Sequence, residues 1–168
     1  MKILGIHDGH NAAACLLEDG VILGAIQEER LSRIKNHDTF PLQSILWLLD
    51  TFGTDVESID AVAMNGFHMP LHRNSRQLIE DTRQRGSSRA ERCIRSWARA
   101  TPLLYRWRRK CRELREREAA EAGIAPGRLV YIEHHRCHAE AAYWGSPFRG
   151  KPVLVLTADG SGDDLCAT

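Results

Sequence analysis

The sequence predicts an α/β fold that opens with a three-stranded antiparallel meander and continues with alternating helices and strands. Three observations predict it: short apolar runs of strand length at the start, apolar residues at helical spacing after Pro41, and a return of short apolar runs further along. The 168 residues, 43% hydrophobic and 27% charged, are typical of one globular domain or part of a larger one.

The meander is expected within the first 26 residues. Residues 2–6, 12–17 and 21–26 form the three apolar runs, and Glu18-Asp19-Gly20 has the composition of a hairpin turn. A helix is expected after Phe40-Pro41, with a stop at Gly53. Its apolar residues fall at helical spacing: Ile45, Leu46, Leu48, Leu49 and Phe52.

The rest of the chain continues the alternation around an unusual segment. Residues 59–64, which end at Asn65-Gly66, predict a fourth strand. Residues 71–122 are rich in arginine and nearly without glycine, which predicts a helical insertion of two helices broken near Gly86.

Beyond this insertion, residues 128–133 indicate a strand and residues 134–144 a helix that ends at Gly145. Residues 153–158 then indicate a buried strand, closed by a glycine-rich turn over residues 159–163. Residues 165–168 resemble the start of a further strand without a partner, so the domain is expected to be incomplete.

Composition excludes several classes of protein. A net charge of +1 gives no overall attraction to a polyanion. Five cysteines without a CxxC pair favour neither a disulfide framework nor a thiolate zinc site. With no run of membrane-spanning length and no signal-peptide core, a cytoplasmic location is expected.

The sequence HHRCH contains the strongest signal of chemistry. His134 and His138 are four residues apart and project from one face of a helix, where two imidazoles can bind one metal ion. Asp159, from the next strand end, would complete a two-histidine, one-carboxylate set with open coordination positions. Two histidines that bind no metal are the alternative.

Two glycine-containing sequences could present backbone N–H groups to an anion. The first is Asp159-Gly160-Ser161-Gly162-Asp163, for which an ordinary hairpin turn is the alternative. The second is Asp8-Gly9-His10-Asn11, for which a polar hairpin loop is the alternative.

Basic residues raise two further possibilities. Arg30, Arg33 and Lys35 follow the third strand and could clamp a phosphate, or simply form a solvated charged turn. The arginines of residues 71–122 could contact nucleic acid, but neighbouring glutamates such as Glu113 neutralise them in part. A solvated helix or a docking face is therefore favoured, and a nucleic-acid partner is not expected.

Three segments together resemble the O-carbamoyltransferases of the NodU/CmcH type. They are ILGIHDGHNAAACLLEDGVILGAIQEERLSRIKNHDTFP, EHHRCHAEAAYWGSPF and VLVLTADGSGD, which cover about two fifths of the chain in the family's order. The resemblance implies an actin-like, ribonuclease-H-like ATPase fold, with residues 1–168 as the N-terminal lobe and residues 71–122 as a variable insertion. Family members are several times longer, so the resemblance implies that this stretch is inactive without the C-terminal part.

The resemblance also implies a reaction and its residues. Carbamoyl phosphate and ATP form carbamoyl-adenylate, and the carbamoyl group then passes to a hydroxyl of a sugar or natural product. His134, His138 and Asp159 match the family's metal ligands, for iron, manganese or zinc. His10 matches a motif histidine near the reacting groups, and Lys35 a phosphate contact. Asn11 stands where many relatives have aspartate.

Two other functions stay open at this stage. One is a metal- or nucleotide-binding fragment that is not catalytic by itself. The other is a threonylcarbamoyl transferase that acts on tRNA, which shares the fold and the histidine pair; the segment EERLSRIKNH resembles the O-carbamoyltransferases instead.

Overall fold

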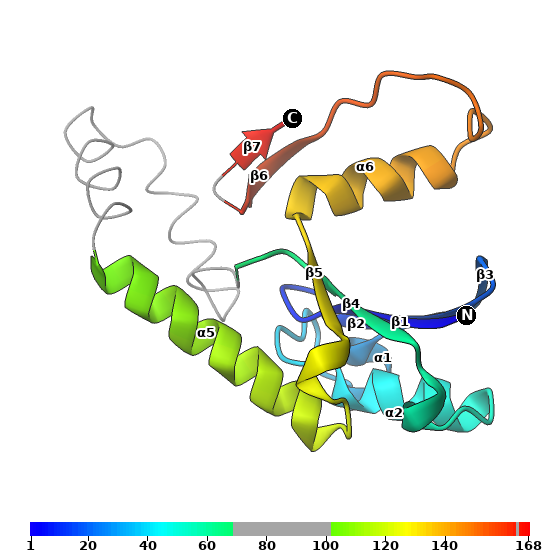
Figure 1. Cartoon of the computed structure of the whole chain (residues 1–168), viewed down its shortest axis with the longest axis vertical. Coiled ribbons are helices and arrows are strands. Elements are labelled where there is room, and N and C mark those ends of the chain that lie inside the picture. The colour runs from blue at the N-terminus through cyan, green and yellow to red at the C-terminus, as the bar shows by residue number, and fades with distance from the viewer. Residues whose placement is uncertain (69–101, 164) are drawn as a thin grey trace.

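A computed structural model describes residues 1–68, 102–163 and 165–168. Its main feature is a five-stranded sheet of order β3-β2-β1-β4-β5, and a separate two-stranded sheet pairs β6 with β7 (Figure 1). The strands of the large sheet are β1 Lys2–His7, β2 Ala13–Glu18, β3 Val21–Gln27, β4 Ala61–Asn65 and β5 Leu129–Ile132.

The predicted meander is confirmed. β1 pairs antiparallel with β2 from Lys2↔Glu18 to His7↔Ala13, and β2 pairs antiparallel with β3. Asp19 and Gly20 join β2 to β3 with φ angles of 48° and 82°. Two consecutive positive φ angles are typical of the tight turn whose twist matches a hairpin, which is why an Asp-Gly pair closes it.

The strands after the meander are parallel to β1. β4 pairs with β1, and β5 pairs with β4, so a crossover segment precedes each of them. The short α1 (Glu28–Ser32) and α2 (Leu42–Thr51) lie between β3 and β4. The helix predicted after Pro41 is thus confirmed, and Gly53 follows it with a φ of 54°, as a terminating glycine does.

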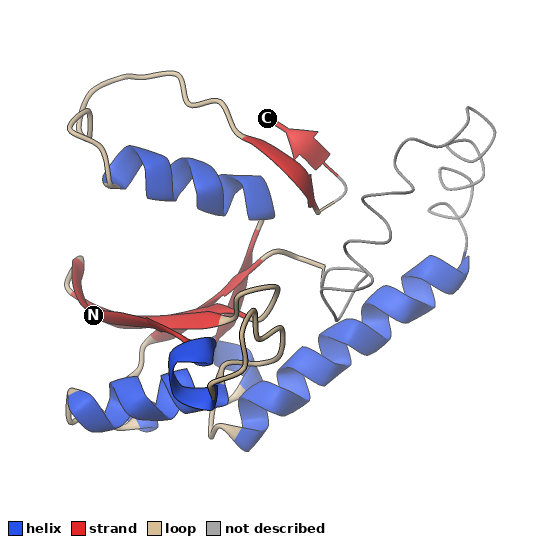
Figure 2. Ribbon diagram, turned by 180° about the vertical axis from the view of Figure 1, so that it is seen from behind, coloured by secondary structure: helices blue, strands red, loops and turns tan. Residues whose placement is uncertain are grey.

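One face of the sheet carries the main core. Alternate strand residues point to this face, and they pack against α2 and the helix that precedes β5. Buried members of the core are Leu4, Ile6, Leu16, Ile45, Leu48, Val62, Met64 and Ala119. The opposite face of the sheet lies toward α6 (His134–Trp144), as Figure 2 shows.

The helix before β5 lies within residues 71–122, where the sequence predicted helices that are solvated or form a docking face. α5 (Pro102–Glu121) connects the parallel strands β4 and β5, and its residues Arg115 and Ala119 are 1% and 0% exposed. Long-range contacts bury these two residues despite the polar composition of α5: Arg115 pairs with Asp8, and Ala119 packs in the core. The break expected near Gly86 lies outside the described residues.

The other face of α5 agrees with the expectation that glutamates neutralise its arginines. Arg109 pairs with Glu113 and Arg112 with Glu116, each four residues along the helix. Such exposed pairs contribute little to stability, because water screens them. They balance the charge of this surface.

Arg115 forms a buried ion pair with Asp8, at the end of β1. Its Nε lies 2.7 Å from Asp8 Oδ2 and its second terminal nitrogen 2.9 Å from Oδ1. The same guanidinium donates to the carbonyl oxygens of Asn65 and Gly66, at 2.8 and 2.9 Å. Arginine's planar fork suits this arrangement, which joins α5 to the ends of β1 and β4.

The strand predicted over residues 153–158 is wrong. Val153, Leu154 and Leu156 are 43%, 86% and 78% exposed, and residues 152–157 lie outside the strands of the described chain. β6 instead spans Ala158–Gly162 and pairs antiparallel with β7, Leu165–Ala167. An apolar β-branched run favours a strand only where a neighbouring strand can satisfy its backbone groups.

Two smaller features complete the fold. Cys15, Cys111 and Cys137 are half-buried free thiols, which agrees with the expectation of no disulfide framework. No helix in the described ranges is long and apolar enough to cross a membrane.

We predict that Arg115→Met lowers the free energy of unfolding by about 3–5 kcal/mol, because it leaves the Asp8 carboxylate buried without its partner. Urea denaturation followed by circular dichroism measures the loss. Arg109→Met, which removes an exposed pair with Glu113, is the matched control and should stay within about 0.5 kcal/mol of wild type. Equal losses in the two variants would contradict the role of the buried pair.

Candidate metal centre

The N-terminus of α6 fixes the two histidines of the predicted site. Glu133 precedes the helix and its carboxylate accepts the backbone N–H groups of His135, at 2.9 Å, and Arg136, at 2.6 Å. This cap satisfies two of the donors that a helix start leaves unpaired. The helix therefore begins at His134, and His138 lies on the same face one turn later.

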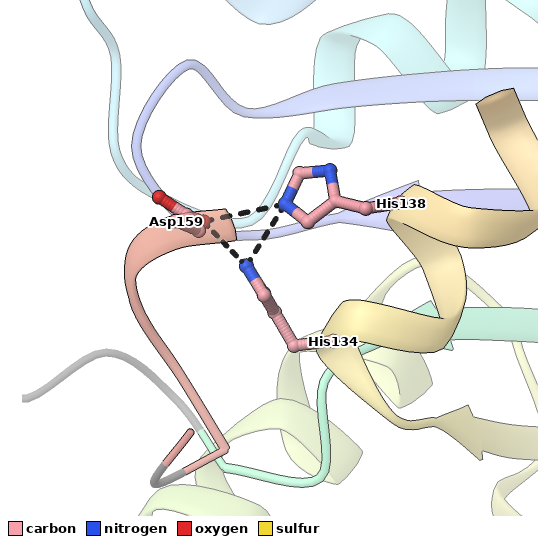
Figure 3. Close-up of side chains that lie close together, drawn as sticks. All are labelled: His134, His138 and Asp159. Atoms are coloured by element: carbon pink, nitrogen blue, oxygen red, sulfur yellow. Dashed lines mark hydrogen bonds and ion pairs between the residues drawn. The ribbon is translucent and has the colours of Figure 1, made fainter. Parts of the chain in front are cut away.

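The structure brings Asp159 to these two histidines (Figure 3). Nε2 of His134 lies 2.8 Å and Nε2 of His138 3.3 Å from Oδ2 of Asp159, and the two nitrogens are 3.0 Å apart. β6 carries Asp159 to this point, and α6 carries the two imidazoles. Two separate elements thus present three potential ligand atoms to one position.

This donor set fits a metal ion. Two imidazole nitrogens bound at about 2.0 Å to one tetrahedral ion are about 3.3 Å apart, close to the observed separation of the two Nε2 atoms. The exposed fractions are 19% for His134, 52% for His138 and 39% for Asp159, so the position faces solvent. An ion held here by three protein ligands would keep positions open for water or substrate oxygens.

A cavity of about 350 Å³ adjoins the centre. Two of the three potential ligands line it, together with small and apolar side chains. Its lining residues are His138, Ala142, Leu156, Thr157, Ala158 and Asp159. A ligand in this cavity would touch the metal position directly.

His135 anchors the segment that leads to Asp159. It is fully buried, and its Nδ1 lies 2.9 Å from Oγ1 of Thr157, which in turn lies 2.8 Å from Oγ1 of Thr168. The histidine between the two potential ligands thus links α6 to the residues around β6 and β7. Sequence reasoning selected its neighbours and missed it, because its spacing carries no metal signal.

His7 is a second residue that sequence reasoning missed. It ends β1, where its Nδ1 lies 2.8 Å from the side-chain amide of Asn65 and its Nε2 lies 3.0 Å from the carbonyl oxygen of His10. Burial lowers the pKa of His7, so the ring is neutral at neutral pH. With the Asn65 amide as donor to Nδ1, the Nε2–H donates to His10 and holds the first hairpin.

Four residues of the loop between β1 and β2, which were predicted to contact an anion or the reacting groups, differ in their exposure. Asp8 is 2% exposed and holds Arg115, and Gly9 is also buried. His10 is exposed, and Asn11 has a positive φ of 63°. Asparagine tolerates this conformation better than most residues. Of the four, His10 presents its side chain most openly to solvent.

Among the described residues, no hydrogen bond in the structure joins the basic residues after β3 to the potential metal ligands. Arg33 and Lys35 are exposed, in the turn after α1. Arg30 pairs with Glu29 at 3.6 Å. The buried Glu28 accepts the backbone N–H of Ser44 at 2.8 Å, and so anchors the start of α2. This segment is partly structural, and its predicted phosphate contact stays a prediction.

The glycine-rich sequence lies within β6 instead of forming a turn. Gly160, Ser161 and Gly162 belong to the strand, where the pairing with β7 is irregular between Ala158 and Gly162. The positive φ of 46° falls at Asp163, after the strand. A Cβ added to Gly162 would lie 2.0 Å from Cδ2 of His134. Gly162 therefore permits the close approach of a potential ligand.

The side chain of Asp163 also contacts the candidate metal centre, through the backbone of His134. Its carboxylate accepts the N–H groups of Phe67, His68 and His134 at 2.9, 2.8 and 2.8 Å. Sequence reasoning treated this residue as the end of a turn. An aspartate next to glycine carries no local signal of long-range backbone contacts.

The fold and the site together define a mixed α/β protein with a two-histidine, one-carboxylate centre. A family model described as Carbamoyltransferase N-terminus matches residues 2–166. The chain therefore belongs to the carbamoyltransferase family, a family of transferases.

Two relatives extend over most of the chain. The uncharacterized protein sll1178 of Synechocystis is 31% identical over 158 residues, covering 92% of this chain and 24% of that protein. Nodulation protein NolNO of Sinorhizobium fredii is 31% identical over 157 residues, covering 92% of this chain and 20% of that protein. The chain thus spans a quarter or less of the length of these relatives.

Among solved structures, YeaZ from Pseudomonas aeruginosa is similar to a part of the chain. It is 21% identical and covers 38% of this chain and 29% of its own, with a TM-score of 0.28. The similarity is too partial to carry an argument about the fold.

We predict that His134→Ala and His138→Ala each abolish stoichiometric metal binding. The wild-type chain should hold about one transition-metal ion, because three ligands converge on one position. Elemental analysis after dialysis measures the metal content, and calorimetric titration with Zn²⁺ measures the affinity. His37→Ala, at a histidine that contacts Ser32 instead, is the control and should keep the ion. A wild-type chain without metal would contradict the site.

We further predict that Gly162→Ala weakens Zn²⁺ binding by at least about 10-fold, because the new methyl group must displace the His134 ring. Calorimetric titration measures the affinity. Gly127→Ala is the matched control, since a Cβ there meets nothing within 4 Å. Unchanged affinity in Gly162→Ala would show that the ring adjusts without leaving the metal position.

Proposed function

We propose that this chain is the N-terminal part of an ATP-dependent O-carbamoyltransferase, and that His134, His138 and Asp159 are its metal ligands. The observation that carries the proposal is the convergence of these three side chains in a member of the carbamoyltransferase family. In the proposed reaction, water splits carbamoyl phosphate into carbamate and phosphate, and carbamate displaces diphosphate from ATP to form carbamoyl-adenylate. A hydroxyl of a sugar or natural product then receives the carbamoyl group.

The fold supports an actin-like, ribonuclease-H-like ATPase domain as the setting of this reaction. Its support is the antiparallel meander that opens the chain, followed by parallel strands linked through helices. Residues 1–168 would form the N-terminal lobe. The remaining polypeptide of the enzyme, the partner in this proposal, would supply the adenosine pocket and a further aspartate ligand.

A divalent ion, once bound, would offset the negative charge of phosphate oxygens on the nucleotide or adenylate. The two neutral imidazoles and the Asp159 carboxylate would hold it at the rim of the cavity beside Ala142 and Leu156. Ala142 and Leu156 would contact a ligand that lies in this cavity. Iron, manganese and zinc all suit two histidines and one carboxylate.

His10 is the proposed catalytic residue. Its side chain is exposed at the first hairpin, and its backbone carbonyl is held by His7. A neutral imidazole nitrogen can orient the acceptor hydroxyl and accept its proton as the hydroxyl oxygen attacks the carbamoyl carbon. AMP leaves as the bond between the carbamoyl carbon and the phosphate oxygen of AMP breaks.

Backbone N–H groups around Gly160, Ser161 and Gly162 are proposed to face phosphate oxygens, as are the exposed side chains of Arg33 and Lys35. Gly9 and Asn11 are proposed to shape the hairpin that presents His10. Asp8 would act indirectly, because Arg115 occupies its carboxylate. A cytoplasmic setting, where ATP and carbamoyl phosphate are formed, completes the proposal.

We predict that His10→Ala lowers the rate of carbamoyl transfer by about 10²–10⁴-fold while metal content stays unchanged, since a general base contributes this much. The enzyme that carries this domain is supplied with ATP, carbamoyl phosphate, Mn²⁺ and a panel of sugar and polyketide alcohols. Acceptor-dependent AMP release is then measured. His68→Ala, at a histidine in the segment after β4, is the control.

An unchanged rate in His10→Ala would remove this residue from the mechanism. No acceptor-dependent AMP release with any alcohol, from a wild-type enzyme that holds its metal, would contradict the proposed reaction.

A further inference from the structure

Asp163 joins α6, which carries both histidines, to the segment after β4 through hydrogen bonds from backbone N–H groups. Oδ2 accepts from His134 at 2.8 Å and from Phe67 at 2.9 Å, and Oδ1 accepts from His68 at 2.8 Å. The three donors belong to the start of α6 and to the segment after β4. Asp163 itself directly follows β6, which carries Asp159.

This arrangement fixes the position of His134 from two sides. The Asp163 carboxylate holds its main chain, and Gly162 lies against its ring, where an added Cβ would come within 2.6 Å of Nε2. Residues 162–163 therefore fix the position of His134 relative to Asp159. Ligand atoms must meet one ion within a few tenths of an ångström, so such support affects affinity.

Helix capping alone does not account for Asp163. Glu133 already accepts the N–H groups of His135 and Arg136 and so caps α6. What Asp163 adds is the hydrogen bond to His134 itself and the connection to Phe67 and His68. Loss of its charge should therefore disturb the metal position more than the helix.

We infer that Asp163 is a positioning residue of the metal centre, which acts through His134 and does not touch the ion. The inference rests on the proposed metal site. It assigns to the end of β6 a second role beside supplying Asp159: it sets the distance between the helix that carries both histidines and the strand that carries the carboxylate.

The backbone conformation permits a sharp test. Asp163 has a φ of 46°, a conformation that asparagine and glycine adopt readily. Asp163→Asn removes the charge and leaves one acceptor oxygen, and Asp163→Gly removes the side chain, neither with added backbone strain. Asp19, with a φ of 48° in the turn between β2 and β3, gives the matched controls Asp19→Asn and Asp19→Gly.

Calorimetric titration with Zn²⁺ alone is the readout, together with urea denaturation of each metal-free chain. Both Asp163 variants should bind Zn²⁺ about 10–100-fold more weakly than wild type, with the larger loss for glycine. The Asp19 variants should bind like wild type. The histidine side-chain NMR signals of the metal-free Asp163→Asn chain should move at His134, while those of His37 stay in place.

Two outcomes would overturn the inference. Zn²⁺ affinity within about twofold of wild type in both Asp163 variants would show that His134 needs no such support. An affinity loss equal to that of an Asp19 variant of the same unfolding free energy would show a general loss of stability instead. If the wild-type chain binds no Zn²⁺ and His134→Ala changes nothing, the proposed metal site fails first, and this result is distinct from the other two.

Discussion

The buried ion pair between Asp8 and Arg115 is the interaction on which the rest of the structure depends. Arg115 reaches from α5 to the carboxylate at the end of β1 and to the carbonyl oxygens of Asn65 and Gly66 at the end of β4. The next two N–H groups of that segment are held by Asp163, which also holds His134. Hydrogen bonds thus connect α5, through the segment after β4 and Asp163, to the candidate metal centre.

Local patterns predicted the parts of the molecule that local chemistry decides. The Asp19-Gly20 turn, the helix after Pro41 and the spacing of His134 and His138 all depend on residues close together in the sequence. The meeting of Asp159 with the histidines was predicted because a strand end and a helix start can present side chains to one point. The structure confirms that the three side chains meet, while their metal stays a prediction.

Long-range contacts explain what the sequence could not predict. α5 has the polar composition of a solvated helix, yet Arg115 is buried because a carboxylate and two carbonyl groups receive its donors. Residues 153–156 have the composition of a buried strand, yet they lie outside the strands of the described chain, and Val153, Leu154 and Leu156 are exposed. The role of Asp163 depends on backbone groups up to 96 residues away, which no local pattern encodes.

The charge of the candidate metal centre suits the phosphate chemistry proposed for it. Two neutral imidazoles and one carboxylate leave a divalent ion with a net positive charge, which favours an anionic ligand at its open positions. The carboxylate of Asp163 would oppose such a ligand if it faced the cavity. Its three backbone hydrogen bonds direct it instead toward the N-terminus of α6, where a negative charge is stabilising. The fold thus places one aspartate on the metal position and keeps the other, four residues later, engaged by the backbone.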